Sequence, residues 1–383
     1  MAAVKNGRRR FLLIKGLLFT ANLIVVALFV MGYAAAYIPP DRNWIFAFAG
    51  LAFPYLALVN VAFILFWLIT GKKYFALISF AVLLLSWSRL GGYFRFHTGY
   101  GQPADTTGIN VLSYNVRLFD LYNWKNNKIS ENTARQFQLL AAQKPDLLCI
   151  QEYHAGKSGK VDISDSIVKY SGLRYKYIAY VTTNGKVRPY GIATFSRWPL
   201  TGTGIVSFEE NPANFCLYAD ILMGQDTIRL YNVHLESIKF SQEDYLFVTD
   251  LRSNQEDQEV FAENSRKILQ KLKRAFISRA RQSRKLAEEI SRSPYPVIIC
   301  GDFNDTPSSY AYHTISGDYN DAFRSGGQGF SQTYAGALPS FRIDYILHDK
   351  NRFSTNSFFR IKEPLSDHYP VVANLSLVLK DER

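Results

Sequence analysis

Residues 297–307, VIICGDFNDTP, hold the side chains of this sequence with the clearest chemical potential. Residues 297–300 are apolar and predict a buried strand, and Asp302 and Asn304 follow it two positions apart. Side chains two positions apart on an extended backbone point the same way, so these two oxygen-bearing groups would converge on one point. A hard cation, or a phosphate held by one, needs this arrangement, although an isolated G-D-x-N could also be an Asx-rich surface turn.

Six further carboxylate, amide or imidazole side chains stand near boundaries between apolar runs and loops: Asn115, Glu152, His234, Asp344, Asp367 and His368. Each has a structural explanation alone, since asparagine ends many strands and a lone histidine after a strand is more often structural than catalytic. Asp344 lies in the mostly apolar run FRIDYIL, where a carboxylate is costly to bury without a partner such as a histidine. Because α/β sheets bind ligands at strand ends, the coincidence of eight such residues predicts one site.

Apolar and alternating runs predict the strands that would position these residues, at 109–116, 146–150, 175–181, 190–195, 214–222, 227–234, 341–347 and 371–379. Asn184 and Gly185 between two of these runs predict a β-hairpin. A helix is predicted at 130–143, with Ser130 as its N-cap, and a shorter one at 310–315.

A long amphipathic helix is predicted at 266–290, where Ile268, Leu272 and Phe276 recur at helical intervals. Nine basic residues lie between Arg266 and Lys285. A solvated helix packed on the domain is the simpler interpretation of this pattern. A surface that binds phosphate or lipid headgroups is the alternative.

Six motifs, SYNVR, PDLLCIQE, YNVHLES, GDFNDTP, RIDYIL and SDHYPV, follow one another between residues 109 and 379. Together they resemble the endonuclease/exonuclease/phosphatase superfamily, which includes deoxyribonuclease-type nucleases, neutral sphingomyelinases and inositol polyphosphate 5-phosphatases. The resemblance implies an α/β fold, a four-layer sandwich of two mixed β-sheets flanked by helices, with the site at one edge between the sheets.

The resemblance also implies a role for each candidate residue. Glu152 would be the main ligand of Mg2+ or Mn2+, with Asn115 and Asp367 close to the metal. Asn304 would hold the phosphate and His234 would bind a phosphoryl oxygen. Three further residues complete the catalytic set that the resemblance implies. Asp302 would orient or deprotonate the attacking water. His368, oriented by Asp344, would act as general base or transition-state stabiliser. These roles agree with the needs of phosphodiester hydrolysis, which are a cation, an activated water and donors to the phosphoryl oxygens.

The motif around His234 narrows the substrate. YNVHLES resembles the deoxyribonuclease, sphingomyelinase and phosphatase branches of the superfamily, whereas apurinic endonucleases typically carry an asparagine-containing motif there. The sequence therefore argues against repair of abasic sites.

Residues 1–95 predict a membrane anchor, with helices at about 11–37, 44–70 and 74–90, before a linker at 96–107 and the enzyme domain at 108–380. The first two apolar stretches exceed the roughly 20 residues that cross a bilayer core. The third is shorter and ends at Arg89, so it could span the bilayer or lie buried against the other two.

The formal charge of +12 is concentrated in this anchor, since residues 1–100 hold ten basic residues and one acidic residue. This excess of basic residues therefore indicates the orientation of the membrane helices and is weak evidence for a nucleic-acid substrate. Basic residues before the first span, with Lys72 and Lys73 after the second, place both segments in the cytoplasm. With three spans the enzyme domain is extracytoplasmic, and with two it is cytoplasmic. Cys149 and Cys300 lie in apolar runs, where cysteine is usually a small hydrophobe.

The sequence thus predicts a multi-pass protein of the cell membrane with a Mg2+-dependent phosphoesterase domain. Its predicted partners are the lipid bilayer and a phosphoester substrate, either a lipid headgroup or nucleic acid, and no protein partner is predicted. An extracytoplasmic nuclease is the first alternative. A catalytically inactive scaffold is the second, which the complete set of acids, amides and histidines argues against.

Overall fold

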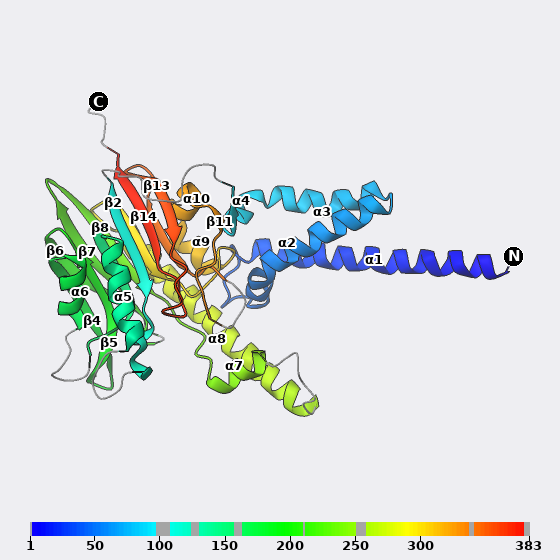
Figure 1. Ribbon diagram of the computed structural model, residues 1–383. Helices are drawn as coiled ribbons and strands as arrows, with labels where there is room; N and C mark the ends of the chain where they lie inside the picture. The colour runs from blue at the N-terminus through cyan, green and yellow to red at the C-terminus, as the bar shows by residue number, and fades with distance from the viewer. Residues whose placement is uncertain are drawn as a thin grey trace.

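The computed structural model places a group of N-terminal helices on one side of a β-sandwich (Figure 1). It describes residues 2–96, 108–123, 130–156, 163–209, 211–249, 258–336 and 341–378, without the side chains of residues 2–12, 122, 123, 242 and 249. Almost all of the predicted linker, residues 97–107, lies outside this part of the chain, as do the basic side chains before the first span.

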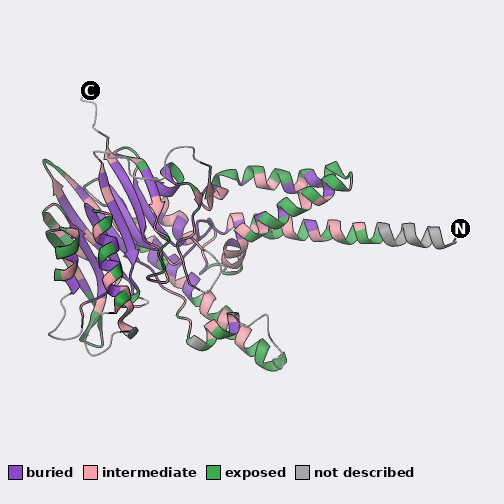
Figure 2. Cartoon of the chain, viewed as in Figure 1, coloured by how far each residue is buried: buried purple, intermediate pink, exposed green. Residues whose placement is uncertain are grey.

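The anchor comprises α1 Ala2–Ala34, α2 Ile45–Ile69, α3 Lys73–Leu85 and the short α4 Trp87–Leu90. Leu13–Ala34 and Ile45–Ile69 are long and apolar enough to cross a membrane, by length and composition. The predicted third span is interrupted at Ser86, so α3 has 13 residues, about 20 Å of helix. That is less than the hydrocarbon core of a bilayer. Figure 2 shows exposed residues along α2 and α3, among them Leu58, Leu77 and Leu84.

A buried polar contact joins the three longer helices. Asn22 of α1 accepts a hydrogen bond from the Trp67 indole of α2 (2.9 Å) and donates one to the Ser79 hydroxyl of α3 (2.7 Å). A polar side chain inside an apolar bundle is stabilised by such a partner, because neither water nor lipid can replace it there. The contact therefore fixes the packing of the three helices.

Two six-stranded sheets form the enzyme domain. The first has the order β10-β12-β9-β8-β7-β6 and the second β13-β14-β2-β3-β5-β4. The pairs β8–β9 and β2–β3 are parallel and the others antiparallel, so both sheets are mixed. The strands of the first sheet are β6 Leu200–Ser207, β7 Phe215–Met223, β8 Asp226–His234, β9 Val297–Asp302, β10 Tyr319–Asp321 and β12 Asp344–Asp349. Those of the second are β2 Ile109–Asn115, β3 Leu147–His154, β4 Tyr175–Thr183, β5 Lys186–Ser196, β13 Phe353–Arg360 and β14 Val371–Leu377, and β1 Phe94–Arg95 pairs with β11 Gly329–Phe330 separately.

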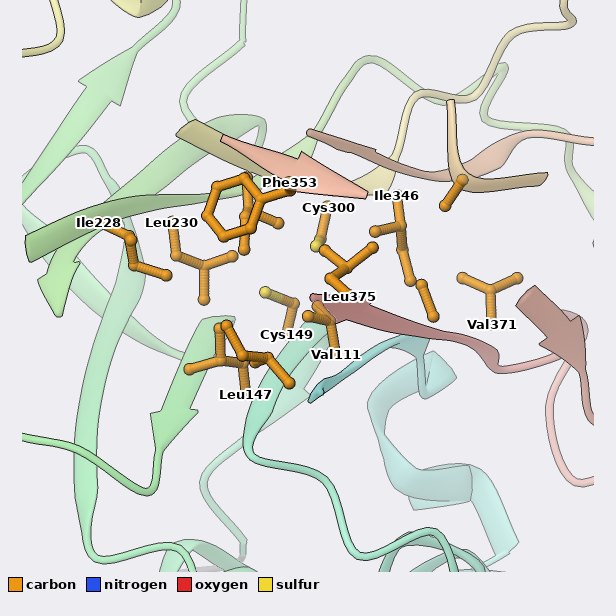
Figure 3. Close-up of a cluster of buried hydrophobic side chains, with 14 of the residues drawn as sticks. Val111, Leu147, Cys149, Ile228, Leu230, Cys300, Ile346, Phe353, Val371 and Leu375 are labelled. Carbon is orange, nitrogen blue, oxygen red and sulfur yellow. The ribbon is translucent and has the colours of Figure 1, made fainter. Parts of the chain in front are cut away.

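Apolar side chains fill the space between the two sheets (Figure 3). Val111 and Cys149 come from the second sheet, and Leu230, Cys300 and Ile346 from the first, and all five are fully buried. Both cysteines are free thiols inside this core, which confirms that they act as small apolar residues.

Helices cover the outer face of each sheet. Because strand side chains alternate, Leu112 and Leu148 point away from the central core and pack with Phe137 of α5 Glu131–Ala142 and Ile167 of α6 Ile163–Ser171. On the other side, α8 Gln258–Ser291 and α9 Tyr310–Ser316 pack on the first sheet, while α7 Gln242–Thr249 lies against α8. The 3-10 segment Arg117–Asn123 and α10 Ala322–Gly326 complete the domain. The predicted four-layer sandwich is confirmed.

Several local predictions are also confirmed. Residues 175–183 and 186–196 form the hairpin around Asn184 and Gly185. The Ser130 hydroxyl caps α5 by accepting a hydrogen bond from the Thr133 amide (3.2 Å). The basic helix is longer than predicted and begins eight residues earlier, at Gln258.

The anchor packs directly on the enzyme domain. The Tyr93 hydroxyl donates to Ser308 (2.9 Å), and Arg284 of α8 pairs with Asp41 in the connection between α1 and α2 (2.6 Å). The ring of Phe48 in α2 lies 5.2 Å from that of Phe276 in α8. The domain therefore sits against the end of the helix group where α1 ends and α2 begins (Figure 1).

Candidate active site

All eight predicted site residues lie at one edge of the sandwich, because the strand register brings them there. In the first sheet His234 pairs with Asp302, and Asp302 pairs with Asp344 on its other side. In the second sheet Asn115 ends β2, and β14 begins antiparallel to it shortly after Asp367 and His368. Asp344 opens its strand, whereas the sequence placed it inside a strand at 341–347.

Asp302 is the centre of the site and joins the two sheets. Its Oδ2 accepts a hydrogen bond from the side-chain Nδ2 of Asn115 in the other sheet (3.0 Å). Its Oδ1 accepts one from the backbone N–H of Asn304 (2.8 Å). Burial raises the pKa of Asp302 to about 6, and the nearby His368 works in the opposite direction. A carboxylate held by amide donors in a buried site is ready to accept a proton or to face a cation.

His368 and Asp344 form a hydrogen-bonded pair. His368 Nδ1 lies 3.0 Å from Asp344 Oδ2 and 3.2 Å from Oδ1, and His368 Nε2 faces Asp302 Oδ2 at 3.7 Å. Burial disfavours the charged imidazole, but the carboxylates of Asp344 and Asp302 outweigh it and raise the pKa of His368 well above its ordinary value. The Thr333 hydroxyl accepts from the Asp344 amide (3.1 Å) and so fixes the carboxylate end of the pair.

His234 presents an unsatisfied nitrogen to the centre of the site. Its buried Nε2 lies 3.8 Å from both Glu152 Oε1 and Asp302 Oδ2 and has no hydrogen-bond partner among the described residues. Burial lowers the pKa of this histidine. Because buried polar atoms are normally hydrogen bonded, this nitrogen is a candidate to contact a ligand at the site.

Glu152 is held in an uncommon backbone conformation. Its φ is +49°, at a register shift between Ile150 and Tyr153 where β3 pairs with β5. The bulge turns the side chain toward Asn115, whose Nδ2 lies 3.4 Å from Glu152 Oε1. Burial, and then the charge of Asp367, raise the pKa of Glu152. The sequence placed this carboxylate just beyond the strand, whereas it lies within it.

Asn304 and Asp367 both line the opening and come from different sheets, since Asn304 follows β9 and Asp367 precedes β14. Asn304, with φ +53°, donates its Nδ2 to the Leu235 carbonyl (3.0 Å) and to Asp302 Oδ2 (3.1 Å). Asp367 Oδ1 accepts from the Ser366 hydroxyl (3.2 Å), and Arg117 Nε lies 3.8 Å from its Oδ2. Arg117 is 59% exposed beside Asp367.

A cavity of about 350 Å3 opens onto this group. Five of the eight residues line it, namely Glu152, Asp302, Asn304, Asp367 and His368. Asn115 and His234 lie against Glu152 and Asp302, and Asp344 contacts His368. The structure therefore brings all eight predicted residues into one constellation.

Sequence reasoning missed two buried amides that support the site. Gln151, next to Glu152, donates to Asn232 Oδ1 across the sheets (2.7 Å), and Asn232 donates to the Ala193 carbonyl (2.9 Å). The sequence does hold a signal for these two residues, since each is a polar residue inside an apolar strand run, in CIQE and YNVH. Such a residue needs a buried hydrogen-bond partner. Tyr334, whose ring lies 5.6 Å from that of His368, carried no such signal.

The donor set fits a divalent cation such as Mg2+ or Mn2+. Hard cations take oxygen ligands, and the site offers three carboxylates around one cavity, from Glu152, Asp302 and Asp367. Burial raises the pKa of both Glu152 and Asp302, so a bound cation would stabilise their ionised forms. Asp302, Asp344 and His368 also form a buried group whose ligand atoms lie within 4.8 Å of one another.

Comparison with known proteins gives matches to two family models and to solved structures. The model described as Endonuclease/Exonuclease/phosphatase family matches residues 112–368, and one described as Domain of unknown function (DUF8431) matches residues 15–93. No curated protein matches the chain.

The chain is also similar to solved structures at low sequence identity, among them the following three. An endonuclease/exonuclease/phosphatase family protein from Leptotrichia buccalis is 16% identical, covering 70% of this chain and 99% of its own, with a TM-score of 0.47. Humanized D. rerio TDP2 is 17% identical over 71% of this chain and 100% of its own, with a TM-score of 0.49. The catalytic domain of human Nocturnin is 17% identical, covering 71% of this chain and 95% of its own, with a TM-score of 0.48.

Proposed function

Since this chain belongs to the endonuclease/exonuclease/phosphatase family, whose members hydrolyse phosphoester bonds, we propose that it is a membrane-anchored, divalent-cation-dependent phosphoesterase. The observation that carries the proposal is that Glu152, Asp302 and His368 line one cavity. Asp344 lies directly behind His368, and His234 Nε2 lies 3.8 Å from both Glu152 and Asp302. Proton transfer, oxyanion contacts and cation binding are then available at a single point.

Glu152, with Asp367 and Asn115 beside it, would hold Mg2+ or Mn2+. When bound, the cation offsets negative charge that develops on the phosphoryl oxygens. Asn115 already donates to both Glu152 and Asp302, so its amide also fixes the spacing of the two carboxylates.

The protein's own groups supply the remaining chemistry. Asp302 and His368 both line the cavity. The Asp302 carboxylate is able to take the proton of the attacking water. His368, whose pKa is raised by Asp344 and Asp302, would hold a proton on Nε2 and stabilise charge in the transition state. Water oxygen forms the new bond to phosphorus, the ester P–O bond breaks, and the leaving oxygen takes up a proton. Asn304 and His234 Nε2 would contact the phosphoryl oxygens, which become more negative in the transition state.

Removal of the cation tests this proposal. The full-length protein in detergent micelles with Mg2+ is expected to hydrolyse bis(p-nitrophenyl) phosphate or p-nitrophenyl phosphate. Chelation with EDTA should lower the rate at least about 100-fold, and added Mg2+ or Mn2+ should restore it. Hydrolysis that is indifferent to EDTA would contradict the cation, and no hydrolysis of either ester by protein that binds Mg2+ would contradict the function.

We also propose that the enzyme domain faces away from the cytoplasm. The domain contacts Asp41 in the connection between α1 and α2, and Phe48 in the first turn of α2. It would therefore lie on the side of the bilayer opposite the N-terminus and residues 70–72. Basic residues are concentrated at the N-terminus and at Lys72 and Lys73, which favours a cytoplasmic location for that side. The short α3 with α4 would return the chain to the domain side.

Reporter fusions test the orientation. Alkaline phosphatase, which is active only after export, is expected to be active when fused after Arg383 and inactive when fused after Lys72. A fluorescent protein that folds only in the cytoplasm should give the reverse pattern. Cytoplasmic activity of the fusion after Arg383 would overturn the extracytoplasmic orientation.

A further inference from the structure

The active-site cavity has one polar end and a largely apolar wall. The catalytic residues form the polar end, and the wall includes Leu51, Phe240, Ile268, Leu272, Phe276 and Phe341. Hydrolysis of a phosphoester needs only the polar end. An apolar wall beside it contributes binding energy only to a substrate that carries an apolar portion, at about 25 cal/mol for each Å2 that leaves water.

This wall is continuous with the membrane anchor. Leu51 belongs to α2, one of the two helices long and apolar enough to cross a bilayer. On either side of it along α2, the ring of Phe48 lies 5.2 Å from Phe276 and the ring of Tyr55 lies 6.4 Å from Phe341. The end of a spanning helix therefore forms part of the cavity that contains Asp302 and His368.

The helix that supplies much of the wall also lies at the expected membrane surface. Lys273 of α8 sits 4.8 Å above the ring of Trp44, just before α2, and tryptophan is enriched at the level of lipid headgroups. Figure 1 shows α7 and the N-terminal half of α8 projecting from the domain on the same side as α1, α2 and α3. Leu246, Val260 and Phe261 are exposed on these projecting segments (42–55% exposed).

The cations of the cavity are poorly suited to a nucleic-acid backbone. Among the described lining residues, Lys239 pairs with Glu236 (2.9 Å) and Arg279 is buried against Asp305 (2.9 Å). Single-stranded nucleic acid requires a basic groove that follows successive phosphates. A wall of aliphatic and phenyl side chains at the end of a spanning helix does not provide one.

We propose that this cavity takes a membrane phospholipid, with its phosphoester at the catalytic end and the first part of its acyl region against the apolar wall. The inference rests on the proposed function of the same site and adds the class of substrate. Hydrolysis breaks one ester P–O bond of the headgroup as water adds to phosphorus, and it yields an alcohol and a phosphate monoester. The substrate would enter from the bilayer in which α2 is embedded.

Matched pairs of soluble substrates test the role of the acyl region. Full-length protein in detergent micelles is assayed on dioctanoyl phospholipids with choline, ethanolamine, glycerol and inositol headgroups, and on the corresponding deacylated glycerophosphodiesters. We expect kcat/KM to be at least about tenfold higher for the acylated member of the preferred pair, since the acyl methylene groups leave water when they contact the apolar wall.

Two leucines of α8 provide a matched comparison. Leu272 lines the cavity, whereas Leu269 is 50% exposed and is not among the lining residues. Leu272→Gln is expected to lower the ratio of kcat/KM values, acylated over deacylated, by about tenfold, because it places an amide in the apolar wall. Leu269→Gln should leave the ratio as in the wild type.

A second measurement does not depend on turnover. The full-length protein is placed in vesicles of phosphatidylcholine that carry a diazirine on the acyl chain, irradiated, and mapped by mass spectrometry. Label on residues 268–276 or on Phe341, in addition to the outer faces of the anchor, is expected. Such label without any hydrolysis would contradict the phosphoesterase but support the lipid site.

Three results would overturn the lipid inference while leaving a phosphoesterase in place. They are equal kcat/KM for acylated and deacylated substrates, label confined to α1, α2 and α3, and metal-dependent cleavage of plasmid DNA in preference to every phospholipid.

Discussion

Glu152→Gln is expected to lower kcat/KM for bis(p-nitrophenyl) phosphate about 1,000-fold, a loss of about 4 kcal/mol of transition-state stabilisation. Glutamine keeps the size of the side chain and loses the negative charge. In the proposed site that charge holds the divalent cation, and the amide that replaces it is a much weaker ligand. The concentration of Mg2+ needed for half-maximal rate should rise at the same time.

The fold should tolerate this change. Burial and the charge of Asp367 both raise the pKa of Glu152, so the ionised carboxylate is held at a cost in the folded protein without a cation. A neutral side chain of the same shape removes that cost. The midpoint of thermal unfolding in detergent, measured without divalent cations, should therefore equal or exceed that of the wild type.

Glu288→Gln is the matched control, since Glu288 is 62% exposed near the end of α8 and pairs there with Arg292. Its kcat/KM should stay within about twofold of the wild type, as expected for an exposed ion pair. Retention of more than about a tenth of wild-type activity by folded Glu152→Gln would remove Glu152 from the proposed metal-binding set.

Much of this site could be predicted because its residues end apolar strands. Asn115, His234 and Asp302 are the last residues of β2, β8 and β9, and an apolar run followed by a polar residue is visible in any sequence. The meeting of Asn115 with Asp302 is different, because these residues lie 187 positions apart and meet only when two sheets stack. The prediction that they share a site came from the number of polar residues at strand ends and from the resemblance to a family, since the pattern around either residue alone does not show it.

Features that depend on a neighbouring element escaped prediction. The bulge at Glu152 arises from the pairing of β3 with β5, and a register shift has no signature in one strand alone. The first turns of α8 were missed because they project from the domain and carry few buried residues, so they show little apolar periodicity. The interruption at Ser86 is likewise hidden within an apolar stretch.

The contact between the N-terminal helices and the enzyme domain is a further feature of the proposed active site that the sequence failed to predict. Sequence patterns treated residues 1–95 and 108–380 as separate units, and hydropathy does not show that Leu51 of α2 lines the cavity of the proposed active site. The alternative interpretation of the basic helix, a surface for lipid headgroups, now gains support from the contact between Lys273 and Trp44.

His368→Ala is expected to cause the largest loss of all, about 10,000-fold in kcat, if His368 transfers a proton or stabilises charge in the transition state. Asp344→Asn should cost about 1,000-fold. Asp344 Oδ2 accepts the Nδ1 proton of His368 at 3.0 Å, and this contact turns Nε2 toward the cavity. An asparagine can instead donate to Nδ1, which favours the wrong tautomer.

The double variant separates a joint role from two independent ones. If Asp344 acts only through His368, then His368→Ala combined with Asp344→Asn should be no slower than His368→Ala alone. Independent contributions would multiply, to about ten-million-fold, which would contradict the pair as a unit. Asp318→Asn, at a side chain that is 93% exposed, is the control and should leave kcat unchanged.

The pKa of His368 gives a further measurement, which a purely structural role of Asp344 would not change. Asp344→Asn removes the nearest of the carboxylates that raise the pKa of His368, so that pKa should fall, while loss of packing alone would leave it in place. The pKa is measured by NMR on the ring protons of His368 without divalent cations, and compared with that in Asp318→Asn. An unshifted pKa in Asp344→Asn would show that Asp344 does not set the state of His368, and the proposed division of roles would fail at that pair.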